Sequence, residues 1–341
     1  MALRASCGRV AVLVGLLFVV AAGVRSLAGA SASPSVPLAR VRDVPLPGHA
    51  TRFDYQSVDE ANRKLYIAHL GDSTLDIVNL DTLHVSGRVP HVADVHGVAV
   101  ASDLHRVFAT ATGTNELVTI DTTTNRVLHR TPTGAFPDGV AYDPDDGLVF
   151  VSNKTDGSVT VVNAGNGRVA GTVTLADETG NVAYDPAARL VYAAVRTPDA
   201  LVAIDPTSRE VTTRIRLSGC DGAHGVYIDA KTRRAFVACE RDARFVTVDL
   251  VRDLQTSTST AGEGPDVLAF DGSSQRLYVA SESGTVSVFT TAPSTPMKLG
   301  QGHLADAAHT VAVDQTTHRI YFPLQDVRGR PVLRVMRPLE R

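Results

Sequence analysis

The chain has 341 residues, a hydrophobic content of 44% and a formal net charge of −3. This composition supports a large core, and the near balance of charges gives no electrostatic footprint for nucleic acid or anionic lipid. The chain has no Trp, which excludes the Trp-Asp dipeptide that marks one common class of repeat protein.

The first 30 residues form a separate segment. Arg4 and Arg9 precede an apolar run over residues 10–24, and small residues at 28–32 offer a cleavage site. These features predict a secretory signal peptide over residues 1–30, with an uncleaved membrane anchor as the alternative. Removing this segment changes the net charge to −6 and leaves residues 31–37 as a flexible lead-in. We therefore expect a periplasmic or secreted protein with no membrane span after cleavage.

From residue 38 to residue 341 the chain repeats one unit of about 42 residues. In each unit, four short β-rich runs alternate with clusters of Gly, Asp, Asn and Pro, which predicts a four-stranded antiparallel meander. The first strands end at Val58, Val100, Tyr142, Tyr184, Ile228, Phe270 and Val313. Eight residues later, the second strands carry Tyr66, Phe108, Phe150, Tyr192, Phe236, Tyr278 and Tyr321. A large ring at one repeated position is suited to packing sheet against sheet.

The repeat predicts an all-β fold, a seven-bladed β-propeller that forms a single domain over residues 38–341. The last unit has only three strands, whereas residues 38–48 resemble a fourth strand without a unit of its own. We therefore expect residues 40–46 to pair with the third strand of the last unit, near Leu333 to Met336. This pairing would close the ring and hide both terminal sheet edges.

The units resemble those of the YVTN-repeat β-propellers, the YncE-like bacterial periplasmic proteins. The resemblance rests on segments such as PDGVAYDP (137–144), LVFVSN (148–153) and SVTVVN (158–163), and it covers residues 38–341. It implies a propeller fold and an exported protein. It implies no particular chemistry, because propellers of this type serve many purposes.

Six of the seven units carry His or Asp four residues before the end of the first strand. The seven residues in chain order are Asp54, His96, Asp138, Gly180, His224, Asp266 and His309. In a propeller these positions converge at the mouth of the central channel, a usual place for ligands. Imidazole and carboxylate suit one divalent cation such as zinc, manganese or iron. The alternatives are a polar organic ligand bound directly, or loop caps in which His and Asp satisfy each other. We expect an opening in the ring at Gly180.

The loops between the second and third strands add further polar residues to the same face. These residues are His69, Lys154, Arg196, Glu240 and Glu282. One interpretation is an exported, monomeric binding protein that presents the mouth to a small polar ligand or a protein partner. The other is a metal-dependent lactone hydrolase or lyase, with His69, Glu240 or Glu282 as general acid or base.

Cys220 and Cys239 are the two cysteines that remain once residues 1–30 are removed. An exported chain meets a compartment that allows oxidation. Both cysteines are expected on the same face of one unit, so we predict a disulfide between them. The alternative is a pair of buried thiols that never meet.

Overall fold

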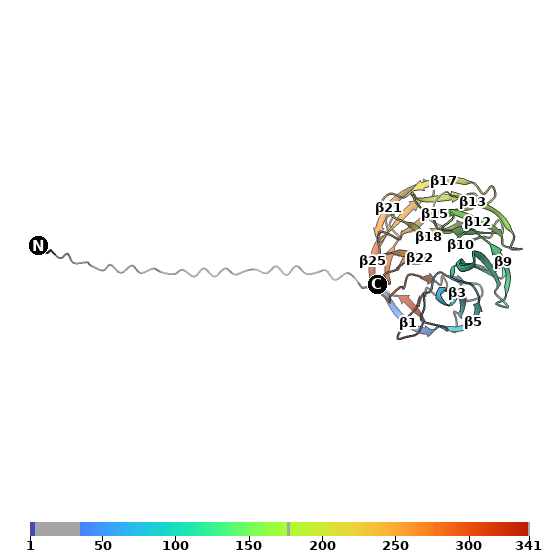
Figure 1. The fold of residues 1–341 in the computed structure, drawn as a ribbon, viewed down its shortest axis with the longest axis horizontal. Coiled ribbons are helices and arrows are strands. Elements are labelled where there is room, and N and C mark those ends of the chain that lie inside the picture. Colours follow the sequence, from blue (N-terminus) through green and yellow to red (C-terminus); the bar gives the residue numbers. More distant parts are fainter. Residues whose placement is uncertain (4–34, 176–177, 340–341) are drawn as a thin grey trace. The chain divides into compact units, whose positions relative to one another are not determined.

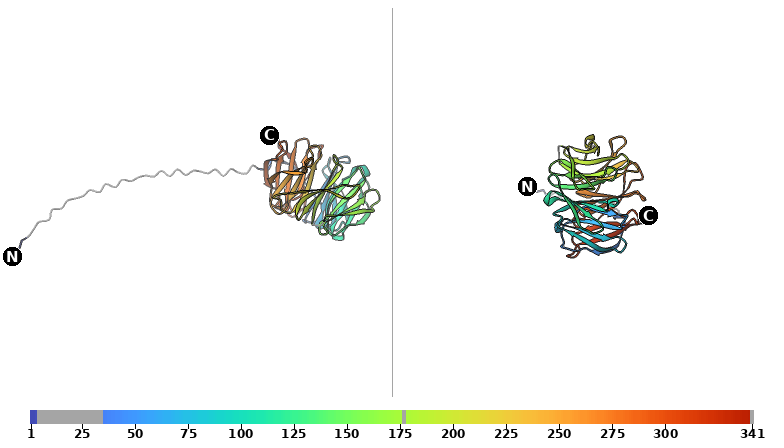
Figure 2. Two further views of the ribbon diagram at one scale, coloured as in Figure 1. Left: turned by 90° about the horizontal axis from the view of Figure 1, so that it is seen from above. Right: turned by 90° about the vertical axis from the view of Figure 1, so that its right-hand side faces the viewer.

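The computed structural model describes residues 1–3, 35–175 and 178–339, so residues 4–30 of the predicted signal peptide lie outside the described residues. Seven four-stranded antiparallel sheets are arranged around a central axis (Figure 1). Figure 2 shows the propeller from two further sides, with the sheets standing side by side. The predicted all-β, seven-bladed propeller is confirmed. Within the described residues, no helix has the length and apolar character needed to cross a membrane.

Blades one to six each use four strands that are consecutive in the chain. Blade one contains β2 (Gln56–Asp59), β3 (Lys64–His69), β4 (Thr74–Asn79) and β5 (His84–Pro90). Blade two contains β6 (Val95–Ala101), β7 (Arg106–Ala111), β8 (Glu116–Asp121) and β9 (Val127–Pro132). Blade three contains β10 (Pro137–Asp143), β11 (Leu148–Asn153), β12 (Ser158–Asn163) and β13 (Val169–Thr174). Short 3-10 turns occupy η1 (Leu70–Asp72), η2 (Ser102–Leu104) and η3 (Thr112–Thr114).

The second half of the ring follows the same order. Blade four contains β14 (Thr179–Asp185), β15 (Leu190–Arg196), β16 (Asp199–Ile204) and β17 (Val211–Arg216). Blade five contains β18 (Ala223–Asp229), β19 (Arg234–Cys239), β20 (Arg244–Asp249) and β21 (Leu254–Thr260). Blade six contains β22 (Pro265–Asp271), β23 (Arg276–Ser281), β24 (Thr285–Thr290) and β25 (Met297–His303). Blade seven contains β26 (Ala312–Val313), β27 (Ile320–Leu324), β28 (Val332–Pro338) and β1 (Leu38–Pro45).

The repeated aromatic of the second strand packs each blade on its neighbour. All seven of these rings are at most 1% exposed. Tyr66 of blade one, for example, shares a core cluster with Val107 and Ala109 of blade two. Burial of a whole aromatic side chain stabilises the fold by roughly 1.5–3 kcal/mol, so the repeated ring is a large term in the packing of each blade.

The aspartate that ends most first strands holds the turn into the second strand. The Asp143 carboxylate accepts hydrogen bonds from the backbone N–H of Asp145 (2.9 Å) and of Asp146 (3.3 Å). The equivalent carboxylates that accept a backbone N–H in their own turns are Asp59, Asp185, Asp229, Asp271 and Asp314. These side chains make up for backbone bonds that a tight turn cannot form.

Blade seven combines the two ends of the propeller chain, which lie side by side as β1 and the C-terminal strands (Figure 1). β1 pairs antiparallel with β28, with Leu38 opposite Pro338 and Pro45 opposite Val332. Across this pair, Arg334 donates to both carboxylate oxygens of Asp43 at 2.9 and 2.8 Å. The N-terminal strand therefore covers the edge of β28.

The predicted disulfide is confirmed. Cys220, in the loop before β18, is bonded to Cys239 at the end of β19, with their Cα atoms 5.2 Å apart. Both residues are buried in the cluster between blades four and five. The bridge therefore fixes the loop that leads into the inner strand of blade five.

Removal of residues 1–45 should destabilise the propeller strongly. The truncation exposes the whole edge of β28 and removes the buried side chains Leu38 and Val44 from the core. We expect a sharp fall in soluble yield and in Tm relative to a chain that lacks only residues 1–30. Equal thermal unfolding curves for the two chains would show that β1 is dispensable.

Loss of the disulfide should lower stability without changing the fold. The two cysteines are 19 residues apart, and a loop of this length contributes about 3 kcal/mol in the chain-entropy model. We expect the Cys220→Ser/Cys239→Ser variant to unfold at lower denaturant concentration than the oxidised parent. Thiol titration of the denatured, unreduced parent should find no free thiol after removal of residues 1–30. Detection of two thiols would contradict the bridge.

Candidate metal and ligand site at the channel mouth

β-Bulges turn the ring residues toward the mouth of the channel. In β6, Val95 lies opposite Ala111 and Val98 opposite Ala109, so His96 and Gly97 together face the single residue Thr110. The same register shift occurs in the inner strands of blades three to six. A bulge redirects the extra side chain out of the sheet. In four of these five blades the redirected residue is the His or Asp of the ring, and in blade four it is Gly180. Asp54 and His309 reach the same rim from the loops before β2 and β26.

Glycines in the bulges let neighbouring blades approach closely. A Cβ atom on Gly97 would lie 2.2 Å from the carbonyl oxygen of Asp138, and one on Gly225 only 1.8 Å from that of Asp266. Gly180 has the same role, since its Cβ would lie 2.6 Å from the Cα of His224. The expectation of an opening at Gly180 is therefore wrong. The backbone of blade five fills the space that a side chain would take.

The ring encloses a small cavity of about 70 Å³. Its lining residues are Arg52, Asp54, His96, Phe136, Asp138, Lys154, His224, Glu240, Asp266 and Glu282. Five of the six predicted metal ligands are in this set, and His309 contacts it through Asp266 and Glu282. The cavity has room for an ion with a few waters, or for a head group of a few atoms.

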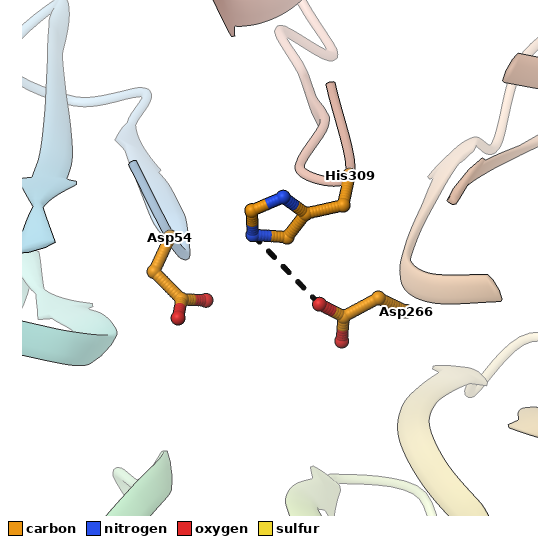
Figure 3. A group of neighbouring side chains, drawn as sticks. All are labelled: Asp54, Asp266 and His309. Carbon is orange, nitrogen blue, oxygen red and sulfur yellow. Dashed lines mark ion pairs between the residues drawn. The ribbon is translucent and has the colours of Figure 1, made fainter. Parts of the chain in front are cut away.

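Asp54, Asp266 and His309 form a compact group of metal-ligand type (Figure 3). One ligand atom from each residue lies within 4.8 Å of the other two, and all three residues are buried. Asp54 Oδ1 and His309 Nε2 have no hydrogen-bond partner among the described residues. The dashed line in Figure 3 joins His309 Nε2 to Asp266 Oδ2, which are 3.9 Å apart.

The backbone fixes the protonation of two of the three imidazoles. His309 Nδ1 lies 2.9 Å from the carbonyl oxygen of Ala307, and His96 Nδ1 lies 2.8 Å from that of Asp94. A carbonyl oxygen only accepts, so Nδ1 carries the hydrogen in both rings. In the neutral ring the lone pair is then on Nε2, the atom that faces the aspartates. This is the arrangement in which histidine serves as a metal ligand.

His224 and Asp266 are a buried, paired acid and base. His224 Nε2 lies 3.3 Å from Asp266 Oδ1 and 3.9 Å from Asp138 Oδ2. Burial opposes the charged ring, but the hydrogen bond and charge of Asp266 raise the pKa of His224 above its ordinary value. Burial likewise disfavours the Asp266 carboxylate, yet the hydrogen bond and charge of His224 hold its pKa below the ordinary value. Asp266 is therefore ionised.

Asp54 has the opposite character. Burial, together with the negative charges of Asp266 and Asp138, holds the pKa of Asp54 well above that of an ordinary aspartate. Its nearest imidazole atom, His96 Nε2, is 3.7 Å away from Oδ2, and burial lowers the pKa of His96. Burial and neighbouring charge thus raise the pKa of Asp54, whereas His224 lowers that of Asp266.

Two arginine–glutamate pairs flank the ring, and Arg52 is a member that the sequence pattern missed. Arg52 donates to both carboxylate oxygens of Glu282 at 3.0 and 2.6 Å. Arg196, which is buried, donates to Glu240 and lies 3.3 Å from His224 Nδ1. These pairs occupy the glutamates that the sequence offered as ligand-binding residues.

Tyr55 closes the floor of the mouth and is a second residue that the pattern missed. Its hydroxyl donates to Asp266 Oδ1 (3.2 Å) and accepts a hydrogen bond from the side-chain amide of Asn181. Below this pair the inner strands line a channel cavity of about 260 Å³. Tyr55 and Asn181 occupy the position where three other blades have glycine, which is the signal that could have revealed them.

His69 lies apart from the cavity lining. Its side chain is fully buried and stacks on Phe53 with a ring separation of 4.1 Å. Its Nδ1 lies 3.2 Å from Asp76 Oδ2 and its Nε2 lies 3.0 Å from Thr51 Oγ1. With both nitrogens engaged, His69 is a structural residue of blade one. The geometry therefore favours a structural role for His69 over the predicted ligand-binding role.

The sequence matches no protein-family model and no curated protein. The fold is similar to that of Kuenenia stuttgartiensis hydrazine synthase, at 13% identity and a TM-score of 0.73, over 86% of this chain and 96% of that one. It is also similar to the WD40 repeats of RRP9, at 10% identity and a TM-score of 0.74, over 89% and 99% of the two chains. A third similar structure is U3-55K, at 11% identity and a TM-score of 0.74, over 90% and 100%. At these identities the likeness shows the β-propeller fold alone.

Replacement of Asp54 by asparagine should stabilise the metal-free protein at neutral pH. Because the folded-state pKa of Asp54 is raised, its contribution to stability is present below the ordinary pKa and is lost as pH rises through the folded pKa. Asparagine imitates the protonated Asp54 side chain, so the variant should not lose stability as pH rises. The charged and titratable neighbours of this side chain are Asp266, Asp138, Glu282, Arg52 and His96. We expect a higher Tm than wild type at pH 7 and equal values at pH 3–4, measured after chelation.

A matched control is Asp76→Asn in the same blade. Asp76 is also buried, but it pairs with Arg88 (3.0 Å) and His69 (3.2 Å), so its removal leaves charges without a partner. This variant should have a lower Tm than wild type. A lower Tm for Asp54→Asn as well would mean that Asp54 is ionised and paired in the folded protein.

Proposed function

We propose that this chain is an exported, YncE-like binding protein that holds one divalent metal ion on Asp54, Asp266 and His309. The proposal depends on one observation, the lack of a hydrogen-bond partner for Asp54 Oδ1 and His309 Nε2 among the described residues. Both atoms are buried, both belong to one compact group, and neither has a hydrogen-bond partner among the described residues. Twenty buried side-chain atoms lack a hydrogen-bond partner among the described residues, and these two are distinguished by belonging to one compact group of metal-ligand type. Two such neighbouring atoms point to a shared partner that the described residues do not supply.

The donor set fits a first-row metal ion. One imidazole nitrogen and two carboxylates suit zinc, manganese or iron. Ligand bonds of about 2.1 Å place two ligand atoms at most about 4.2 Å apart, so the group must close by a few tenths of an ångström around an ion. Two of these ligands also have a neighbour that can hold them in position. His224 lies against Asp266, and Glu282 lies 3.7 Å from His309 Nδ1.

Export is the best-supported location. The apolar run over residues 10–24 behind two arginines is typical of a secretory signal. The Cys220–Cys239 bridge is consistent with a compartment that permits oxidation, either the periplasm or the cell exterior. A rigid propeller with a small polar mouth is suited there to capture of an ion or of a small ligand.

The enzyme alternative, a lactone hydrolase or lyase, has less support. A general acid or base must be free to exchange a proton with a substrate beside the metal. Glu240 and Glu282 are held by Arg196 and Arg52, and His69 uses both ring nitrogens within blade one. The geometry therefore favours binding over catalysis.

Replacement of His309 by alanine should abolish tight metal binding. The variant loses one of three direct ligands, and loss of even an indirect partner typically lowers affinity by about 10- to 100-fold, so we expect a larger fall. A metal at about 100 times its Kd raises the unfolding free energy of the parent by about 2.7 kcal/mol. Isothermal titration and thermal unfolding with Zn²⁺, Mn²⁺ and Fe²⁺, after chelation, measure both effects.

The matched control is His303→Ala. His303 lies in the strand before the same loop, is exposed, and pairs with Asp306 at 3.3 Å outside the mouth. This variant should bind metal as the parent does, and far-UV circular dichroism should show that both variants fold. Equal metal affinities for the two variants, or no uptake of any of the three ions by the parent, would contradict the proposed function.

A further inference from the structure

Phe136 is an exposed aromatic side chain at the edge of the mouth. It is 37% exposed and lines the mouth cavity together with the ring residues. It also borders two open hollows of about 390 and 420 Å³ on the same face. Its ring meets that of His96 edge-on, with the centroids 5.3 Å apart. An aromatic face in this position is accessible to a ligand that enters the mouth.

The backbone at Phe136 does not favour a bulky residue. In five blades, the residue two positions before the His or Asp of the channel mouth has a left-handed backbone conformation. The φ angles are 45° at Asp94, 58° at Phe136, 72° at Gly222, 63° at Gly264 and 54° at Ala307. Glycine fits this conformation best, and a large side chain there strains the backbone. Burial offsets the strain of Phe136 only in part, because the residue remains 37% exposed. A role in contact with another molecule would account for it.

Lys154 supplies a free positive charge beside this ring. Its ammonium lies 5.6 Å from the centroid of Phe136, and it lines the same cavity. Among the described residues, no carboxylate pairs with Lys154, whereas Arg52 and Arg196 are each paired with a glutamate. The ammonium is therefore available to an anion.

The size of the cavity limits what can bind. A volume of about 70 Å³ accepts a metal ion and a group of two or three atoms. The body of any larger ligand must lie outside, in the hollow bounded by Phe136, Lys154, Thr155 and Glu178. A carboxylate is small enough for the mouth cavity, and a flat ring joined directly to it would lie in the outer hollow over Phe136.

Charge decides the order of binding. The lining contains five carboxyl groups, of Asp54, Asp138, Asp266, Glu240 and Glu282, against the two permanent cations Arg52 and Lys154. The acidic groups are in excess, so an anionic ligand is disfavoured in the absence of metal. A divalent ion at the group of Asp54, Asp266 and His309 offsets much of this excess and gives an anionic ligand a direct partner. An organic cation is disfavoured because the Lys154 ammonium, 5.6 Å from the centroid of the Phe136 ring, would repel it.

We propose that the metal-loaded mouth binds an aromatic carboxylate, whose carboxylate meets the ion and Lys154 and whose ring lies on Phe136. The proposal rests on the proposed metal site. It adds the class of the second ligand and the requirement that the metal binds first.

Titration of benzoate, acetate and benzylammonium into the full chain with and without Zn²⁺ tests this proposal. We expect benzoate to bind only to the zinc-loaded protein, and more tightly than acetate. Phe136→Leu should lower benzoate affinity by about three- to tenfold and leave acetate affinity unchanged, because the aliphatic side chain lacks the aromatic face. Lys154→Met should weaken both anions. Lys298→Met is the control, since Lys298 lies 5.7 Å from the ring of Phe289 away from the mouth.

Phe136→Gly separates a binding role from a structural one. Glycine relieves the left-handed backbone strain, so Tm and Zn²⁺ affinity should be retained or raised while the preference for benzoate over acetate is lost. A lower Tm with benzoate binding retained would overturn the role of Phe136. Zinc uptake without benzoate binding would overturn the second ligand and leave the metal site intact. Benzoate binding to the zinc-free protein would overturn the order, and absence of zinc uptake would overturn both proposals.

Discussion

The packing of one blade on the next is the interaction on which the rest of the molecule depends. Each four-stranded sheet has two apolar faces, and the buried aromatic of the second strand fills the space between a sheet and its neighbour. Because a blade alone cannot bury these faces, the sheets must stack, and a closed ring leaves no face without a partner. The inner strands are thereby held side by side at fixed spacing around the channel.

This fixed spacing is what assembles the candidate site. The inner strands of blades two to six each bear a bulge near their start, and the extra residue points into the mouth whatever its chemical type. In blades two, three and five a glycine follows and allows the backbone of the next blade to approach, as Gly97 does with Asp138. Four of the six side chains of the site thus depend on one repeated local feature, and Asp54 and His309 join them from loops. No single blade contains the site.

The sequence predicts what repeats and misses what does not. The period, the buried aromatics and the ring residues all recur at one spacing, so the fold and most of the mouth lining could be predicted. The pattern marks Tyr55 only as a departure from the glycine of three other blades, and its contact could not be predicted, because its partner Asp266 lies 211 residues further on and across the channel. His69 is the last residue of β3, one position earlier in the repeat than Lys154 and Glu282, and its Nδ1 pairs with Asp76 within its own blade. Such contacts depend on which side chain lies opposite in space, and a periodic sequence pattern does not reveal this.

The ring also forces like charges together. Asp54, Asp138 and Asp266 cannot separate, because each is fixed by its own blade and the blades are fixed by one another. His224 neutralises Asp266, and what remains is a demand for a cation near Asp54. Burial and the crowding of these carboxyl groups raise the pKa of Asp54, and a cation at the proposed site would relieve the same repulsion. The spacing of the blades thus sets the electrostatic problem that any ligand of the mouth must answer.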